Sequence, residues 1–255
     1  MTLEIVTIPC LADNYAFLLR DRATGKVALV DAPESYPIQK TLRDKGWHLD
    51  MVLLTHHHND HIDGLPVLVE EYHPQVIGAK ADANRLPPLD LALNEGDTVS
   101  VGESMGHIID VSGHTIGHIA FHFPSASAVF TADSLMALGC GRLFEGTPEM
   151  MWASLSKLAA LPSDTIVYSG HEYTASNAKF ALTVEPQNAA LQTRIADITA
   201  KRAKGIPTVP SSLAAELATN PFLRAHLPAM KTAVGMEGAP NNEVFAAIRK
   251  QKDIF

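Results

Sequence analysis

The sequence has few of the features that mark secreted or membrane-spanning proteins. Only two of its 255 residues are cysteines, Cys10 and Cys140, which is too few for a disulfide framework, and neither lies in a CxxC pair. No apolar run approaches the roughly 18 residues that a spanning helix needs, and "MTLEIVTIPC" lacks the pattern of a signal peptide. We therefore expect a soluble protein in a reducing compartment, the cytoplasm.

Positive charge is also scarce. The formal net charge is −8, whereas general affinity for nucleic acid or for an anionic membrane requires a basic surface. We expect no nucleic-acid or membrane partner, and no obligate protein partner is evident. An anionic small ligand would have to meet a local basic cluster.

The first two thirds of the chain contain strand and helix patterns in alternation. "LEIVTIPC" and "NYAFLLRDRATGKVALVDA" predict short strands, with a hairpin turn at Thr24 and Gly25. "YPIQKTLRDKG" predicts a helix that Gly46 ends, and the apolar "DMVLLT" predicts a strand buried on both faces. Five further strands are expected in "VIGA", "DTVSV", "GHIIDVSG", "AFHFPS" and "AVFTAD". The expected class is layered α/β with a mixed sheet.

The pattern changes after Tyr173, where strand signals cease. "TASNAKFALTV", "PQNAALQTRIADITAKRAKG", "SSLAAELATN" and "NNEVFAAIRKQKD" are typical of helices. We expect a domain at residues 1–172 followed by a small helical domain at 173–255.

A dense group of histidines and aspartates follows the strand predicted in "DMVLLTHHHNDHIDG". His56 and His58 are two residues apart, so both side chains point to the same side of an extended segment. Asp60 and His61 follow where "IDGLPVLVEEYH" begins to resemble a helix. Imidazoles combined with carboxylate suit a borderline cation such as zinc. These four residues are candidate metal ligands.

Three more apolar strands end in a possible ligand: His114, Asp133 and His171. Because ligands in open α/β sheets bind outside the strand ends, this recurrence indicates one site assembled from distant loops. His57 and Asn59 alternate with the proposed ligands and are expected to be structural, while His118 is expected to orient a ligand. The remaining histidines lie in no such context and are interpreted as ordinary surface or hydrogen-bonded groups: His48, His73, His107, His122 and His226.

The motifs "THHHNDH", "SGHTIGHI", "FTADS" and "YSGHEYT", in this order, resemble those of the metallo-β-lactamase superfamily. "GCGRLFEGT", "GHEYT", "NPFLR" and "AIRKQKDIF" resemble the glyoxalase II family, the hydroxyacylglutathione hydrolases, so the resemblance covers nearly the whole chain. It implies an αββα sandwich followed by a small all-helical C-terminal domain. It also implies hydrolysis of S-D-lactoylglutathione to glutathione and D-lactate, the second step of methylglyoxal detoxification.

The same resemblance implies two divalent metal ions. His56, His58 and His114 would bind one ion, Asp60, His61 and His171 the other, and Asp133 would bridge them. Zinc is the expected metal, and iron or manganese would also suit these ligands. A hydroxide between the ions, oriented by Asp60 and Asp133, would attack the thioester carbonyl.

Substrate contacts implied by the resemblance fall on Arg142, Phe144, Tyr173, Arg249 and Lys252. Two positions depart from the family pattern. Phe144 stands where many relatives have tyrosine, so a phenol hydrogen bond to glutathione is missing or replaced. Ala132 stands where glycine is usual, and we expect it to be tolerated.

The residues themselves favour thioester chemistry. A thiol with a pKa near ~8.5 leaves readily, so no strong proton donor is required. Neither Cys10 nor Cys140 has the adjacent base that a thiol nucleophile needs.

Two competing hypotheses remain. One is a mononuclear iron oxygenase of the same superfamily acting on glutathione persulfide, which would not be expected to carry the basic helical tail. Another is a metal-dependent phosphodiesterase or nuclease, which the net negative charge of the chain disfavours. A non-enzymatic metal-binding module is weaker still, because both metal subsites are complete and leave room for water.

Overall fold

The computed structural model describes residues 2–255 as two compact units. The first unit extends to Asp110 and includes Ile116–Thr131, and the second contains Val111–Thr115 and Ala132–Phe255. The short segment 111–115 thus belongs to a different unit from its neighbours in sequence. We describe each unit separately.

The first unit contains a mixed sheet in the order β1-β2-β3-β4-β5-β6. Strands β1, β2 and β3 pair antiparallel, whereas β3 to β6 run parallel to one another. The bounds are Leu3–Cys10 (β1), Asn14–Asp21 (β2), Val27–Val30 (β3), Met51–Leu53 (β4), Gln75–Ala79 (β5) and Leu91–Leu93 (β6). The parallel pairing brings the carboxyl ends of β3 and β4 to one edge, which is where the segment containing His56 begins.

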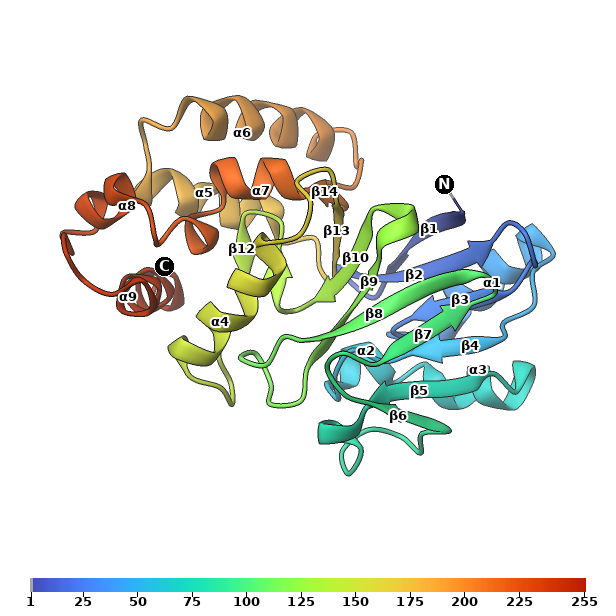
Figure 1. Cartoon of the computed structure of the whole chain (residues 1–255). Helices are drawn as coiled ribbons and strands as arrows, with labels where there is room; N and C mark the ends of the chain where they lie inside the picture. Colours follow the sequence, from blue (N-terminus) through green and yellow to red (C-terminus); the bar gives the residue numbers. More distant parts are fainter. Residues whose placement is uncertain (1) are drawn as a thin grey trace. The chain divides into compact units, whose positions relative to one another are not determined.

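Helices α1 (Ser35–Lys45) and α3 (Leu65–Tyr72) pack on this sheet (Figure 1). Ile38 and Leu42 of α1 share an apolar core with strand residues and with Trp47, which lies just beyond the helix. Gly46 ends α1 in a left-handed conformation with φ 64°, as the sequence predicts. The helix that the sequence predicts here, with its end at Gly46, is therefore confirmed.

Four antiparallel strands form a second layer in the first unit: β7 (Thr98–Val101), β8 (Ser104–Asp110), β9 (Ile119–Phe123) and β10 (Ala128–Ala132). The two layers are in contact, because the rings of Phe17 and Phe130 lie 5.6 Å apart and Ser104 donates a hydrogen bond to Asp21. Every residue of β9 and β10 is buried. The expected layered α/β class is confirmed.

The second unit is mostly helical. Its helices are α4 (Pro148–Ala159), α5 (Thr174–Val184), α6 (Ala189–Arg202), α7 (Leu213–Thr219), α8 (Pro228–Ala233) and α9 (Asn241–Asp253). Its strands are β11 (Leu135–Met136), β12 (Gly139–Cys140), β13 (Ile166–Ser169) and β14 (Ser211–Ser212). Trp152 on α4 packs against Phe245 on α9, with ring centroids 6.2 Å apart. The four helices predicted after Tyr173 are confirmed.

Some short elements differ from expectation. The helix predicted from Ile62 is split into α2 (Asn59–Ile62) and α3, whose first turn contains Pro66, a residue without the N–H that a continuous helix would use there. The expectation that strands cease after Tyr173 is wrong in one place, since β14 pairs with β13. Residues 2–255 also contain three single-turn 3₁₀ helices: η1 (Lys80–Asp82), η2 (Pro124–Ala126) and η3 (Pro221–Leu223).

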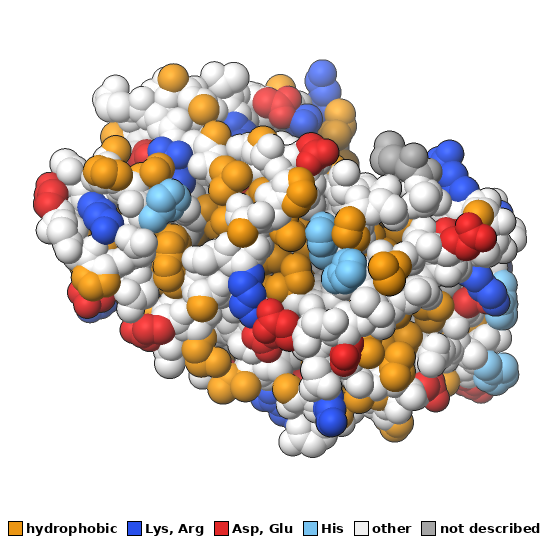
Figure 2. Space-filling view, in the orientation of Figure 1, with side chains coloured by type: hydrophobic (Ala, Val, Ile, Leu, Met, Phe, Trp, Pro, Cys, Tyr) orange, Lys and Arg blue, Asp and Glu red, His pale blue; other side chains and the backbone are white. Residues whose placement is uncertain are grey.

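The surface shows no continuous basic area on the face drawn in Figure 2, where lysine and arginine side chains alternate with acidic ones. Among residues 2–255, no helix is long and apolar enough to cross a membrane.

Candidate metal centre

In the first unit, four predicted ligands lie on the loop from β4 into α2. The imidazoles of His56 and His61 are buried. The Nε2 atom of His56 lies 3.1 Å from Nδ1 of His58, and Nε2 of His61 lies 3.8 Å from Oδ2 of Asp60. The two ring nitrogens of His56 and His58, only 3.1 Å apart, must share either a proton or a metal ion. The predicted convergence of these four side chains is present within the unit.

Asp31 orients this loop from the end of β3. One of its oxygens, Oδ2, accepts hydrogen bonds from Nδ1 of His61 and from the hydroxyl of Thr55, both at 2.8 Å, while Oδ1 accepts from the Thr55 backbone. The Thr55 hydroxyl in turn lies 3.0 Å from Nδ1 of His56. With Nδ1 of each imidazole engaged in this way, Nε2 presents its lone pair, which is how histidine commonly binds a metal.

Asp60 is also held in place. The side-chain amide of Asn14 donates to Oδ2 and to the backbone carbonyl of Asp60, each at 3.0 Å. Asn14 begins β2 and is itself buried. The carboxylate therefore has one fixed neighbour on the sheet as well as His61 beside it.

In the second unit, Asp133 lies between two predicted ligands. Its Oδ2 is 3.4 Å from Nε2 of His114, and its Oδ1 is 3.3 Å from Nε2 of His171. The Nδ1 atom of His114 donates to the backbone carbonyl of Arg142 at 2.7 Å. A carboxylate whose two oxygens each face a different imidazole has the geometry that a bridging ligand needs.

The backbone around Asp133 is tightly constrained. Ala132 adopts a left-handed conformation with φ 40°, which is unusual for a residue with a side chain. Gly141 approaches so closely that a Cβ would lie 1.9 Å from the carbonyl oxygen of Asp133. Only glycine fits at position 141, and Ala132 is accommodated at the cost of local strain.

The histidines expected to be structural or orienting behave accordingly. His57 turns to the buried Asp82, whose Oδ2 lies 2.9 Å from its Nδ1. His118 stacks on His56 with ring centroids 4.6 Å apart, and its Nδ1 lies 3.2 Å from the carbonyl of Ile119. His57 thus makes a structural contact, whereas His118 contacts the ring of a candidate ligand, His56.

Two of the predicted substrate contacts rest on metal-ligand candidates. The ring of Phe144 lies edge-on to His114 at 5.2 Å, and Tyr173 stacks on His171 at 4.7 Å. Both rings are substantially exposed, at 62% and 40%. Each of these two imidazoles therefore has an exposed aromatic ring beside it that an apolar or amide part of a ligand could contact.

Of the basic residues Arg142, Arg249 and Lys252, the first two lie beside one carboxylate, that of Asp253. Its Oδ1 lies 3.6 Å from Arg142 and 2.9 Å from Arg249. Lys252 follows on the same helix, and burial, with Arg249 nearby, lowers the pKa of its ammonium. Three cations with one anion leave a local positive charge in a chain whose net charge is −8.

Arg249 differs in its surroundings from the other two. Its side chain is buried together with Val244, Phe245 and Ile248, and it donates to the carbonyl of Cys140 at 3.0 Å. The guanidinium also lies over the ring of Phe222. Arg249 therefore belongs to the buried side chains of α9.

Neither thiol is suited to act as a nucleophile. Burial, with Glu34 nearby, raises the pKa of Cys10 to about 12, and burial raises that of Cys140 to about 11 despite the neighbouring Arg249. At neutral pH both remain protonated.

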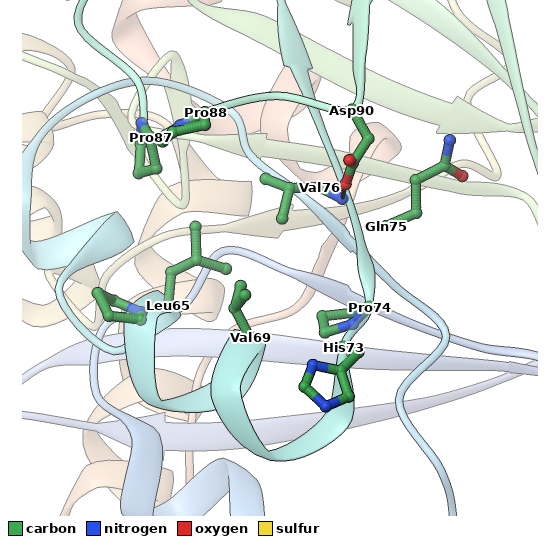
Figure 3. Close-up of a pocket in the computed structure, with 10 residues that line it drawn as sticks. Leu65, Val69, His73, Pro74, Gln75, Val76, Pro87, Pro88 and Asp90 are labelled. Atoms are coloured by element: carbon green, nitrogen blue, oxygen red, sulfur yellow. Dashed lines mark hydrogen bonds between the residues drawn. The ribbon is translucent and has the colours of Figure 1, made fainter.

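A separate apolar pocket in the first unit involves none of the predicted site residues. It has a volume of about 830 Å³, and Figure 3 shows it between α3 and the loop before β6. Its lining includes Leu65, Val69, Pro87 and Pro88, and the carboxylate of Asp90 is bonded to the Val76 backbone. The metal-ligating chemistry lies elsewhere in the chain.

The donor set fits a borderline divalent cation. All seven predicted ligands, five imidazoles and two carboxylates, are among the side chains that could hold a metal ion. The sequence interpretation missed two side chains that orient them: Asn14, which bonds to Asp60, and Asp31, which bonds to His61. For Asp31 the signal was available, because it also follows an apolar strand, in "VALVDA".

Comparisons with protein families divide the chain into two parts. Residues 12–171 match the family model described as metallo-beta-lactamase superfamily. Residues 172–255 match the model described as hydroxyacylglutathione hydrolase C-terminus.

Two relatives of high similarity are both named hydroxyacylglutathione hydrolase. The chain is 65% identical over 255 residues to the protein from Ruegeria pomeroyi, with all of both chains covered. It is 64% identical over 252 residues to the protein from a Jannaschia species, covering 99% of this chain and 98% of the relative.

Solved structures share the fold at low sequence identity. A BLEG-1 B3 metallo-beta-lactamase matches with a TM-score of 0.66 and 19% identity, covering 86% of this chain and 99% of the other. ETHE1 from Myxococcus xanthus matches with a TM-score of 0.65 and 24% identity, covering 100% and 99%. These likenesses concern the fold alone.

Proposed function

The chain belongs to the hydroxyacylglutathione hydrolase family of the metallo-β-lactamase superfamily and is a thioester hydrolase, and we propose that it cleaves S-D-lactoylglutathione to glutathione and D-lactate. The observation that carries this proposal is the 65% identity over the full length of a relative named hydroxyacylglutathione hydrolase, and residues 172–255 also match the C-terminal model of that family. The metallo-β-lactamase fold with a helical C-terminal region agrees with it. The division into domains at residues 1–172 and 173–255 and a cytoplasmic location remain proposals.

Family membership and the histidine and aspartate side chains imply that the chain binds divalent metal. We propose two ions, zinc in the first place, with iron or manganese as alternatives. The ligands would be His56, His58 and His114 for one ion and Asp60, His61 and His171 for the other, with Asp133 shared. Within the second unit, the position of Asp133 between His114 and His171 supports the shared role.

Such ions, when bound, supply Lewis-acid polarisation of a carbonyl and a water whose pKa falls from about 15.7 toward 7. The protein's own contribution is to hold the ligands in a fixed geometry. Asp31 fixes the ring of His61, and the Arg142 carbonyl fixes the ring of His114. Asp60, held by Asn14, and Asp133 are the proposed catalytic carboxylates, which would orient the attacking water.

The exposed rings and the basic cluster are proposed to bind the glutathione moiety. Phe144 and Tyr173 would border the thioester, because each rests on a ligand imidazole. Arg142 and Lys252 would attract the glutathione carboxylates, and Arg249 would contribute to the same positive potential. Phe144 offers no hydroxyl, so binding at that position depends on ring contact alone.

Expulsion of the glutathione thiolate requires little help from an acid, since a thiol has a pKa near ~8.5. The two cysteines of the chain are protonated and buried, so a covalent thiol intermediate is disfavoured. Direct attack by water is the chemistry that the described side chains support.

The decisive experiment is a thioesterase assay with bound-metal analysis. Protein loaded with zinc should hydrolyse S-D-lactoylglutathione and should lose this activity on removal of the metal by a chelator. The competing iron oxygenase, which the helical C-terminal match makes less supported, would instead consume oxygen with glutathione persulfide. Oxygen uptake without thioester hydrolysis would refute the proposed reaction.

A further inference from the structure

A short hairpin connects two parts of the candidate metal centre. Strands β11 and β12 form it at residues 135–140, starting two positions after Asp133. It leads directly into Gly141 and Arg142, whose carbonyl accepts the hydrogen bond from His114. Both ends of the hairpin therefore adjoin a proposed ligand or its orienting partner.

The hairpin cannot define its own shape. Each strand has only two residues, and Leu138 in the turn adopts a left-handed conformation with φ 56°. An isolated hairpin is marginal in water even when it is longer than this one. Its conformation must come from the residues that surround it.

Side chains of the helical region hold the hairpin backbone at successive positions. The amide of Asn220 donates to the carbonyls of Met136 and Gly139, at 3.1 and 2.9 Å. Glu216 accepts from the Leu138 N–H at 2.8 Å. Two further donors act on neighbouring carbonyls: Asn177 on Ala137, at 3.1 Å, and Arg249 on Cys140, at 3.0 Å.

This polar network is fully buried at its centre. Glu216 and Asn220 have no exposed surface, and Arg194 pairs with the Glu216 carboxylate, which also accepts from the Ser211 hydroxyl. Burying a carboxylate is costly unless it is paired and hydrogen-bonded. A satisfied buried network of this kind admits few alternative arrangements, so it fixes one conformation of the backbone that it holds.

We propose that Asn220 and Glu216, with Arg194, are positioning residues for the metal centre. They act through the hairpin, keeping Asp133 and the Arg142 carbonyl in the arrangement that metal binding requires. The affinity of the second unit's ligands for metal therefore depends on helix α7 and on the segment after it. This inference rests on the proposed ligand roles of Asp133 and His114.

The test compares two asparagines of the helical region. Asn220 and Asn188 each accept a backbone N–H at a helix start and each donate from Nδ2 to backbone carbonyls. Asn188, however, donates to Ala218 and not to the hairpin. Asn188→Ala is thus a matched control for the loss of a capping asparagine.

Zinc affinity is measured on both variants by competition with a chromophoric chelator, at a temperature where circular dichroism shows folded protein. Asn220→Ala should bind zinc roughly 10-fold more weakly than wild type, at the low end of the effect of removing an outer-shell partner. Its hydrolytic rate should recover at saturating zinc. Asn188→Ala should lose thermal stability but retain wild-type zinc affinity.

Equal zinc affinity in wild type and Asn220→Ala would overturn the proposal, as would an equal loss in the Asn188→Ala control. If Asn220→Ala does not fold, Asn177→Ala, which removes a single hairpin bond, decides the question in the same assay. A wild-type protein that binds zinc without hydrolysing the thioester would refute the proposed substrate while leaving this contrast measurable. If wild type bound no zinc, both proposals would fail.

Discussion

The two units present their candidate ligands in different ways. In the first unit, His56, His58, Asp60 and His61 lie within six consecutive positions of one loop. In the second, His114, Asp133 and His171 each follow a different strand signal and are far apart in sequence. The first set forms a motif that can be found by inspection, whereas the second requires a fold to bring it together.

The means of support differ as well. Buried side chains of the first sheet, Asp31 and Asn14, bond directly to ligands there. In the second unit the support passes through backbone, since the Arg142 carbonyl orients His114. The ligands that lie close together in sequence are thus held by single side chains, which a mutation can remove. The ligands that lie far apart in sequence depend instead on backbone that the surrounding fold holds in place.

The largest effect is expected at Asp133, the residue that links the two dispersed histidines. Asp133→Ala should reduce turnover to the background rate. It should also lower metal affinity by more than the roughly 10- to 100-fold that follows the loss of a residue hydrogen-bonded to a ligand. His57→Ala, in the contiguous loop but turned to Asp82, should keep its metal and nearly all activity. Elemental analysis with initial rates checks both. Comparable metal loss in the two variants would show that the ligand positions are assigned wrongly.

The support of the contiguous loop can be broken directly. Asp31→Asn replaces the acceptor that holds Nδ1 of His61 and the Thr55 backbone, so metal affinity should fall roughly 10- to 100-fold. Zinc competition measures this change, and Asp50→Asn, at a carboxylate that accepts from Lys26 and from the Val27 backbone but contacts no candidate ligand, serves as the control. Unchanged zinc affinity would show that Asp31 does not support the metal site.

Within the basic cluster, the structure separates Lys252 from Arg249. Lys252→Ala should raise KM for S-D-lactoylglutathione roughly 10- to 100-fold, the effect of losing a charge-assisted hydrogen bond worth about 1.5 to 3 kcal/mol, with kcat little changed. Hydrolysis of a small thioester that lacks glutathione should be unaffected. Arg249→Ala should also raise KM. Unlike Lys252→Ala, it should also slow the hydrolysis of the small thioester, because Arg249 holds the backbone carbonyl of Cys140 in the hairpin beside the candidate metal centre. Steady-state kinetics with both substrates test the distinction, and identical profiles would contradict it.

Each unit also contains one buried thiol. These two thiols should make the free energy of unfolding depend on pH in the alkaline range. Burial raises the pKa of Cys10 from 9.0 to about 12 and that of Cys140 from 9.0 to about 11. Above pH 9 the unfolded chain loses these protons first, so the free energy of unfolding should be highest below pH 9. It should then fall by at most about 1.4 kcal/mol per pH unit for each thiol.

Denaturant titrations between pH 8 and pH 11 measure this dependence. Cys10→Ala and Cys140→Ala should each have a shallower slope than wild type, whatever their stability at pH 8. A wild-type slope retained in both variants would mean that other groups cause the loss of stability.

The smallest effect is expected at Ala132, beside the dispersed ligand Asp133. A left-handed φ costs a residue with a side chain about 1–2 kcal/mol, whereas glycine loses an extra ~0.4–1 kcal/mol of chain entropy on folding. Ala132→Gly should therefore stabilise the protein by up to about 1 kcal/mol, seen as a higher melting temperature. Clear destabilisation would show that the Ala132 methyl group contributes packing that outweighs the strain.

The sequence predicted much of this arrangement for identifiable reasons. Helix α1 has an apolar stripe and a glycine stop, and α9 was bounded correctly from its pattern in "NNEVFAAIRKQKD". The seven ligand candidates follow apolar strands, a signal that survives without knowledge of the fold. Asp31 carried the same signal, but its role depends on a bond to His61, 30 residues away.

Other features could not be predicted because they depend on distant partners. Glu216 in "SSLAAELATN" resembles an ordinary solvated helix residue, and only its pairing with Arg194 and the Leu138 backbone explains its burial. Arg249 likewise resembles a surface cation until the Cys140 carbonyl is placed beside it. The β11–β12 hairpin is too short to display any periodicity.

The two tryptophans of the chain fall one in each unit, Trp47 beside the core of the first sheet and Trp152 against Phe245 on α9. The protein thus carries a separate intrinsic fluorophore for each region. Trp47→Phe would leave an emission signal from the second unit alone, and Trp152→Phe a signal from the first. Unfolding followed in the two variants would show whether both halves of the ligand set are lost in one cooperative transition or in succession.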